Sequence, residues 1–119
     1  MCLYTKIVEL EYGANDNGRY YKFSDGSLIC LKYKSFTGIN ITTAWGSLYE
    51  TSLLSVGDWA YPFASDPYVT ATCRSGGIAA FIETVGANAT GVTGIYLCRP
   101  NSVSNVTVNV DFIAIGRWK

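Results

Sequence analysis

Residues 103–118 read VSNVTVNVDFIAIGRW, and this stretch decides how the chain folds. Its first part alternates apolar and polar residues, which is the pattern of a β-strand that buries one face. The apolar face consists of Val106, Val108, Val110 and Phe112, and the polar face of Thr107, Asn109 and Asp111. Ile113 and Ile115 then continue the polar face with apolar side chains. Unless a bulge shifts the register, both faces need cover there. We therefore predict that Ile113 and Ile115 lie in an interface between copies of the chain.

Short runs of the same kind, separated by Gly, Asn, Asp and Pro, occur at residues 6–12, 19–23, 27–33, 68–73, 78–85 and 90–99. Asp25-Gly26 predicts a tight hairpin between the second and third runs, because both residues adopt positive φ at little cost. Residues 13–18 have the composition of a loop, and Ile39 and Ile41 indicate a strand in the less regular middle. No segment shows helical periodicity with caps. These features predict an all-β fold, an antiparallel β-sandwich. We expect one domain over residues 1–119, with N-terminal strands and a hairpin in 1–35 and the sandwich core in 36–119.

Composition points to self-association. Of the 119 residues, 49% are hydrophobic and 15% are charged, whereas about 25% charged residues is usual. A domain of this size buries only about 65% of the surface of its unfolded chain, so its own core holds a limited amount of apolar material. Copies of the same chain are the simplest cover for the rest. The alternative is a polar surface built from Ser, Thr and Asn.

Several partner classes have no sequence support. Nine basic and nine acidic residues cancel, and no basic run indicates nucleic acid or an anionic membrane. No apolar stretch approaches the ~20 residues of a membrane helix, and residues 1–12 lack the layout of a signal peptide. The four cysteines, Cys2, Cys30, Cys73 and Cys98, form no C-x-x-C pair, and there is no histidine. We expect no metal, no cofactor and no membrane insertion, and we interpret the cysteines as reduced thiols rather than as disulfides.

Catalytic signatures are also missing from the sequence. Without histidine, the Ser-His-Asp and Cys-His schemes are excluded, and no S-x-x-K spacing marks a lysine base. Asp58, Asp66 and Glu83 could act as paired carboxylates only if the fold held them ~5–9 Å apart. Acids of turns and of the surface explain them better, because Asp favours turns. We predict that the chain is not an enzyme and has no catalytic residues.

Aromatic residues are the strongest indication of a ligand. The chain has nine tyrosines and three tryptophans, whose flat faces suit the C–H patches of sugars and give large contact area at low entropic cost. The predicted ligand-binding residues lie beside turns or loops: Trp45, Trp59, Tyr61, Arg99 and Asn101. The alternative for each aromatic residue is a place in the sandwich core or in an interface between subunits.

Two stretches carry a pattern of strands and turns: DWAYPFASDPYVTA at residues 58–71 and VTVNVDFIAIGRW at residues 106–118. Together they resemble the C-terminal receptor-binding domain of bacteriophage tail-fibre proteins. Residues 18–31 fit the same pattern, with an aromatic strand, Asp-Gly and an apolar strand. The second half is also similar to the H-type lectin domain, a six-stranded sandwich that trimerises and binds sugars. H-type lectins tend to carry Trp and Asp before the last strand, where this chain has CRPNS at residues 98–102.

The resemblance implies a homotrimer at the tip of a phage or prophage tail fibre, made in the bacterial cytoplasm and carried on the virion. Its partners would be the rest of the fibre and a bacterial surface polysaccharide, which the domain would recognise as the receptor. A second hypothesis is a structural domain that trimerises or caps the fibre without touching the receptor. A third is a depolymerase, although the sequence shows neither long parallel repeats nor a cluster of carboxylates.

Overall fold

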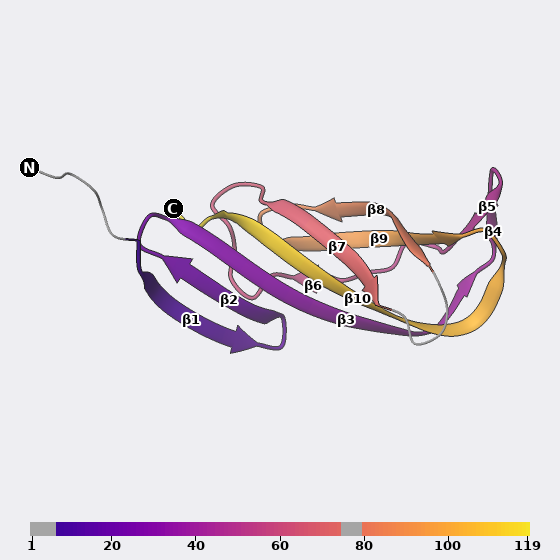
Figure 1. Ribbon diagram of the computed structural model, residues 1–119, viewed down its shortest axis with the longest axis horizontal. Helices are drawn as coiled ribbons and strands as arrows, with labels where there is room; N and C mark the ends of the chain where they lie inside the picture. Colours follow the sequence, from indigo (N-terminus) through magenta and orange to yellow (C-terminus); the bar gives the residue numbers. More distant parts are fainter. Residues whose placement is uncertain (1–6, 75–79) are drawn as a thin grey trace, which may run out of the picture.

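The computed structural model describes residues 7–74 and 80–119, which form two antiparallel sheets packed against each other (Figure 1). Sheet A contains, in spatial order, β1 (Glu9–Asn15), β2 (Gly18–Phe23), β3 (Ser27–Ile41), β10 (Val103–Arg117) and β7 (Tyr68–Arg74). Sheet B is centred on β9 (Gly91–Arg99), with β8 (Phe81–Ala87) on one side and β5 (Leu48–Glu50) and β6 (Gly57–Asp58) on the other. The short strand β4 (Thr43–Trp45) pairs with β5. The predicted all-β antiparallel sandwich is confirmed.

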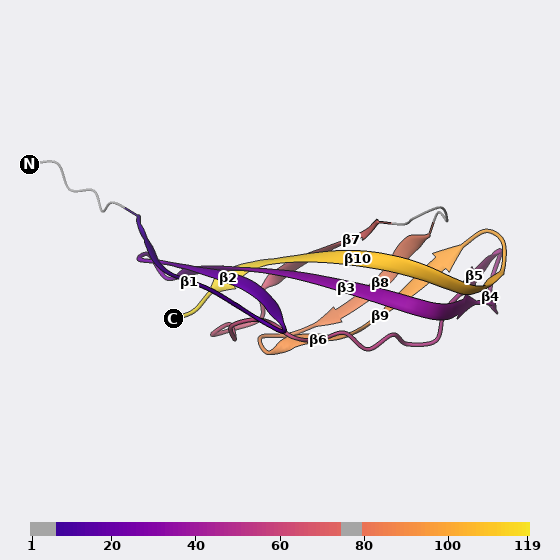
Figure 2. The ribbon, with the colours of Figure 1, turned by 90° about the horizontal axis from the view of Figure 1, so that it is seen from below.

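The longest strands, β3 and β10, give the molecule its elongated shape (Figure 2). Each has 15 residues, which at about 3.4 Å per residue corresponds to about 50 Å. The sequence predicted one strand over residues 27–33 and a separate strand around Ile39 and Ile41, but both belong to the single strand β3. The expected boundary between residues 35 and 36 therefore falls inside one strand, and β1 to β3 belong to the same sheet as β10.

The bulge in the pairing of β10 with β3 lies before Val108, and none occurs near Ile113 and Ile115. Its pairing with β3 shifts between Val103 and Val108, close to Asn105, which has a positive φ of 54°. From Val108 to Arg117 the pairing is continuous. Ile113 and Ile115 therefore stay on the same face of the sheet as Asp111, as the alternation predicted.

Two tight hairpins lie at the start of the described residues. β1 and β2 pair as far as Asn15 and Gly18, so only two residues form the turn, and the loop predicted for residues 13–18 is mostly strand. Gly18 has a φ of +121°, and a Cβ there would lie 2.1 Å from the carbonyl oxygen of Leu31. The predicted hairpin at Asp25-Gly26 is confirmed, with Gly26 at a φ of 94° and the Asp25 carboxylate accepting hydrogen bonds from Ser27.

The core lies between the two sheets. On β10 it includes the residues predicted for the inner face, since Val108, Val110 and Phe112 are buried and Val106 is half-buried. The facing side consists of residues of β9 and of the segment before β7: Val92, Ile95, Leu97, Trp59 and Phe63. Cys30, Cys73 and Cys98 are free thiols, and Cys2 lies outside the described residues. Burial raises the pKa of the Cys30 thiol to about 11.

Polar contacts fasten the β1–β2 hairpin to the rest of the sandwich. The Lys22 ammonium lies 3.3 Å from Glu11, donates to the Tyr61 hydroxyl at 3.2 Å, and sits 4.5 Å and 4.4 Å from the ring centres of Tyr61 and Trp118. Lys32 is buried and donates to the carbonyl oxygen of Asp58 at 3.0 Å. Burial lowers the pKa of Lys32. Among the described residues, no helix is long and apolar enough to cross a membrane.

Candidate functional site

The face of sheet A that points away from sheet B, here called the outer face, is rich in apolar residues. Because side chains alternate along a strand, residues paired across the sheet share a face. One row of paired residues crosses all five strands: Tyr12, Tyr21, Ile29, Ile115 and Tyr68. The next row is Ala14, Arg19, Leu31, Ile113 and Thr70. The predicted pair Ile113 and Ile115 thus belongs to a continuous surface.

This outer face is not covered by the chain itself. Ile113 is 45% exposed, Ile115 is 51% exposed, and Tyr68 is 88% exposed. Exposing large apolar side chains side by side is unfavourable in water and marks surfaces that bind another molecule. Their role as an interface stays a prediction. The sequence analysis missed the contribution of β3, although the run LICL at residues 28–31 is apolar on both faces and could have indicated it.

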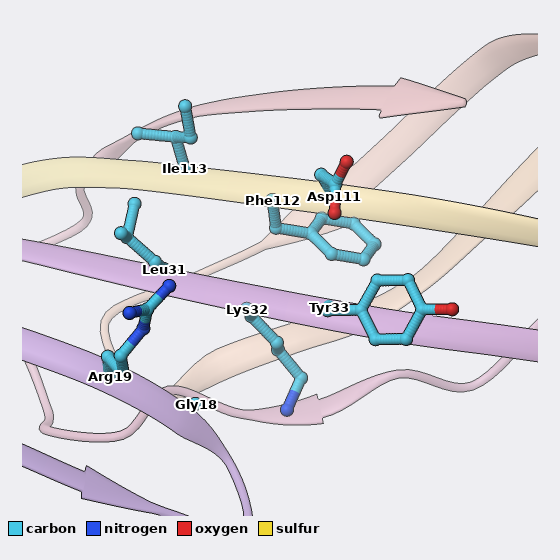
Figure 3. Close-up of a pocket in the computed structure, with 8 residues that line it drawn as sticks. All are labelled: Gly18, Arg19, Leu31, Lys32, Tyr33, Asp111, Phe112 and Ile113. Carbon is cyan, nitrogen blue, oxygen red and sulfur yellow. The ribbon is translucent and has the colours of Figure 1, made fainter. Parts of the chain in front are cut away.

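A depression of about 390 Å³ is set into this surface where β2 begins (Figure 3). Its lining residues come from β2, β3 and β10: Gly18, Arg19, Leu31, Lys32, Tyr33, Asp111, Phe112 and Ile113. Leu31 and Ile113 are directly paired across the two long strands and give it an apolar floor. Lys32 and Phe112 are buried, and their alternation in the strands directs their side chains to the opposite face of the sheet.

Charged groups border the depression. Arg74 binds Asp111 with two nitrogen–oxygen contacts of 2.8 Å and 2.9 Å, and its guanidinium lies 5.3 Å from the ring centre of Tyr33. Arg19 is exposed and forms no ion pair within the described residues. Among the residues that the structure describes, the border therefore offers the exposed guanidinium of Arg19, the exposed ring of Tyr33 and the carboxylate of Asp111, which is already ion-paired.

The predicted ligand-binding residues fall into two groups at different places. Trp45 lies in the β4–β5 hairpin, Arg99 is paired with Tyr49 of β5, and Asn101 is exposed in the connection that follows β9 (Figure 1). These three share one end of the molecule. Trp59 is hydrogen-bonded through its backbone to Thr90, just before the start of β9. The length of β9 places it about 27 Å from Arg99.

Trp59 and Tyr61 are held by contacts within the chain. Trp59 is 3% exposed, donates its indole N–H to the Asn88 carbonyl at 2.9 Å and packs edge-on against Phe63 at 6.1 Å. This is the core position that the sequence analysis gave as the alternative for each aromatic residue. A ligand-binding role of Trp59 stays a prediction. Tyr61 is half-buried, and its ring lies 5.1 Å from that of Tyr20. Trp45, by contrast, is 49% exposed.

The acids considered for catalysis are dispersed. Asp58 is exposed, and the Asp66 carboxylate accepts a hydrogen bond from the backbone of Ala89, which is the turn role expected for it. The carboxyl group of Glu83 interacts with that of Glu50, which the sequence analysis did not select. Burial raises the pKa of the Glu83 carboxyl, and the interaction with Glu50 raises it further. No local signal links two acids 33 positions apart in the sequence.

No protein family model matches the chain, and no curated protein matches it at a significant level. Among solved structures, it is similar to an N-truncated R1-type pyocin tail fibre, with 14% sequence identity and a TM-score of 0.49. The similarity covers 94% of this chain and 86% of the pyocin fibre chain.

Proposed function

We propose that this chain is the tip domain of a phage or prophage tail fibre, that it assembles as a homotrimer and that it recognises a glycan on the bacterial surface. The observation that supports assembly most directly is the outer face of sheet A, where Ile113, Ile115 and Tyr68 are exposed beside one another. Identical copies of a chain bury such a face by closing around a symmetry axis. The domain would then be part of the virion.

The arrangement of the molecule supports a separate place for the receptor. Trp45, Arg99 and Asn101 lie at the end formed by the β4–β5 hairpin, away from the N-terminal hairpin (Figure 1). An exposed indole can stack on a sugar ring, while guanidinium and amide groups bind its hydroxyls. A trimer would present three copies of this end, and several weak sites together bind a repetitive surface far more tightly than one. We propose that the domain binds its receptor without catalysis. The resemblance of its second half to the sugar-binding H-type lectin domain supports a glycan as the receptor.

The outer face also favours the second candidate, a domain that trimerises or caps the fibre without touching the receptor. Assembly needs only the apolar surface, so Ile113 and Ile115 support both candidates equally. The two differ at Trp45: a receptor-binding domain depends on this exposed side chain, and a structural cap does not.

Light scattering on the purified chain tests assembly, and retention on intact bacterial cells tests recognition. We expect a trimer that cells retain, and we expect Trp45→Ala to lose retention while mass and melting temperature stay unchanged. Leu53→Ala is the matched control, because Leu53 is similarly exposed but lies outside the proposed site. A wild-type chain that stays monomeric contradicts the proposal. A trimer that no cells retain leaves the structural cap, and sugar release abolished by Glu83→Gln would identify a depolymerase.

A further inference from the structure

Tyr68 is the most exposed of the large apolar side chains that the structure describes, at 88%. It stands on β7, the edge strand of sheet A, and is paired with Ile115 on the outer face. At this exposure the Tyr68 ring buries little apolar area within its own chain, and that burial would be favourable. Residues of this type are enriched in protein interfaces because they bury a large area with few rotatable bonds.

The depression lies on the same outer face but on other strands. Its apolar floor is Leu31 and Ile113, and Arg19 and Tyr33 border it (Figure 3). The high exposure of Tyr68 shows that this residue does not fill the depression of its own chain. An exposed, projecting side chain and a depression are thus present on one face of the same molecule.

We infer that Tyr68 of one copy inserts into the depression of the next copy. The inference rests on the proposed function, because it requires identical chains to assemble through the outer face. The two surfaces that meet are different, which makes the contact heterologous, and a heterologous contact closes into a ring when the rotation allows it. A three-membered ring places each Tyr68 in a neighbour's depression.

The chemistry of the depression fits a tyrosine. Leu31 and Ile113 offer an apolar surface for the ring. Arg19 has no ion pair within the described residues, and a guanidinium binds the face of an aromatic ring more strongly when water is excluded. The Asp111 carboxylate has lone pairs beyond those that Arg74 uses and can accept the tyrosine O–H.

The size of the outer face suits a second copy. Five strands spaced by about 4.8 Å give the face a width of about 24 Å, and the seven-residue edge strands β1 and β7 give it a length of about 24 Å. The flat area is therefore roughly 570 Å², without the added area of the side chains. The exposed continuation of β3 and β10 adds to it. A stable interface buries about 800 Å² on each partner, so the flat five-stranded part supplies about 70% of that area and the continuation of β3 and β10 would supply the rest.

Chemical cross-linking of the full chain tests which side chains meet. The variant with both Tyr68→Cys and Tyr33→Cys, treated with a short bismaleimide at a protein concentration high enough to offset the loss of the Tyr68 ring, should give covalent trimers on a denaturing gel, because each copy links to the next around the ring. Each single variant and the wild-type chain, which reports on the native cysteines, should form no cross-link and run as monomers on the denaturing gel. The control pair Tyr68→Cys with Phe81→Cys should not cross-link, because Phe81 is exposed on sheet B.

A double-mutant cycle on assembly gives a second measurement. Tyr68→Ala and Ile113→Ala should each weaken trimer formation roughly tenfold or more, and the double variant should lose clearly less than the product of the two effects. Phe81→Ala should leave assembly unchanged. If the wild-type chain is a trimer but the variant with Tyr68→Cys and Tyr33→Cys forms no cross-link and the cycle shows no coupling, the insertion of Tyr68 is overturned and the proposed function stays intact. A monomeric wild-type chain overturns both.

Discussion

Replacing Trp59 by alanine separates a role in the core from a role in binding. The side chain is 3% exposed, and its truncation leaves a cavity between Phe63 and the start of β9. Removing a buried tryptophan costs about 3–5 kcal/mol, and the loss of the hydrogen bond to the Asn88 carbonyl contributes to this cost. We take about 4 kcal/mol as the expected loss. A domain of 119 residues has a free energy of unfolding of about 6–18 kcal/mol, so a quarter to two thirds of it would be lost.

Urea unfolding and thermal melting followed by circular dichroism measure this loss, at one protein concentration for all variants because assembly also stabilises the fold. The melting temperature should fall by roughly 12–20 °C at about 3–5 °C per kcal/mol. Trp45→Ala is the control, because Trp45 is half exposed and its truncation should change stability by no more than about 0.5 kcal/mol. Our reasoning is refuted if Trp59→Ala unfolds like the wild-type chain, and a stable Trp59→Ala that loses glycan binding would return this residue to the binding site.

Three further results are expected. The Cys30 thiol, with its pKa raised to about 11 by burial, should resist alkylation near neutral pH in the folded chain and react readily in urea, as mass spectrometry would show. Gly18→Ala should lower stability by about 1–3 kcal/mol in urea unfolding, because its φ is +121° and a Cβ would meet a carbonyl oxygen. Burial and Glu50 raise the pKa of the Glu83 carboxyl, so the folded chain binds a proton at Glu83 more tightly than the unfolded chain does. The free energy of unfolding therefore falls as pH rises through the pKa that Glu83 has in the folded chain. Melting temperatures measured between about pH 4 and about pH 8 should fall less with rising pH in Glu83→Gln than in the control variant Glu9→Gln.

Local backbone geometry explains what could be predicted from the sequence. Side chains alternate between the two faces of a strand, and this alternation predicted opposite faces for two sets of residues. In the structure Val108, Val110 and Phe112 are buried, and Ile113 and Ile115 lie on the exposed face. The hairpin at Asp25-Gly26 was predictable for the same reason, since the positive φ of Gly26 is a property of the turn itself. Where the local signal was weak, prediction failed, as in residues 13–18, which are polar and yet mostly form strand.

Trp45 and Trp59 show what the sequence could not settle. Each lies beside a glycine or aspartate of a turn, and nothing in their neighbours along the chain separates them. Trp59 is buried because its backbone pairs with Thr90, which brings Asn88 and the start of β9 over its ring. Trp45 stays exposed because its hairpin projects at the end of the sandwich.

The sequence by itself determined the class of fold, most strand positions and the two-sided apolar character of the last strand, because these depend on alternation over a few residues. Tertiary structure alone decided which strands lie side by side, and with that the rows of the outer face and the depression between Arg19, Leu31 and Ile113. These residues lie up to 94 positions apart in the sequence, from Arg19 to Ile113, and meet only because β3 pairs with β2 and β10. Burial and proximity depend on such long-range pairing, which no short stretch of sequence contains.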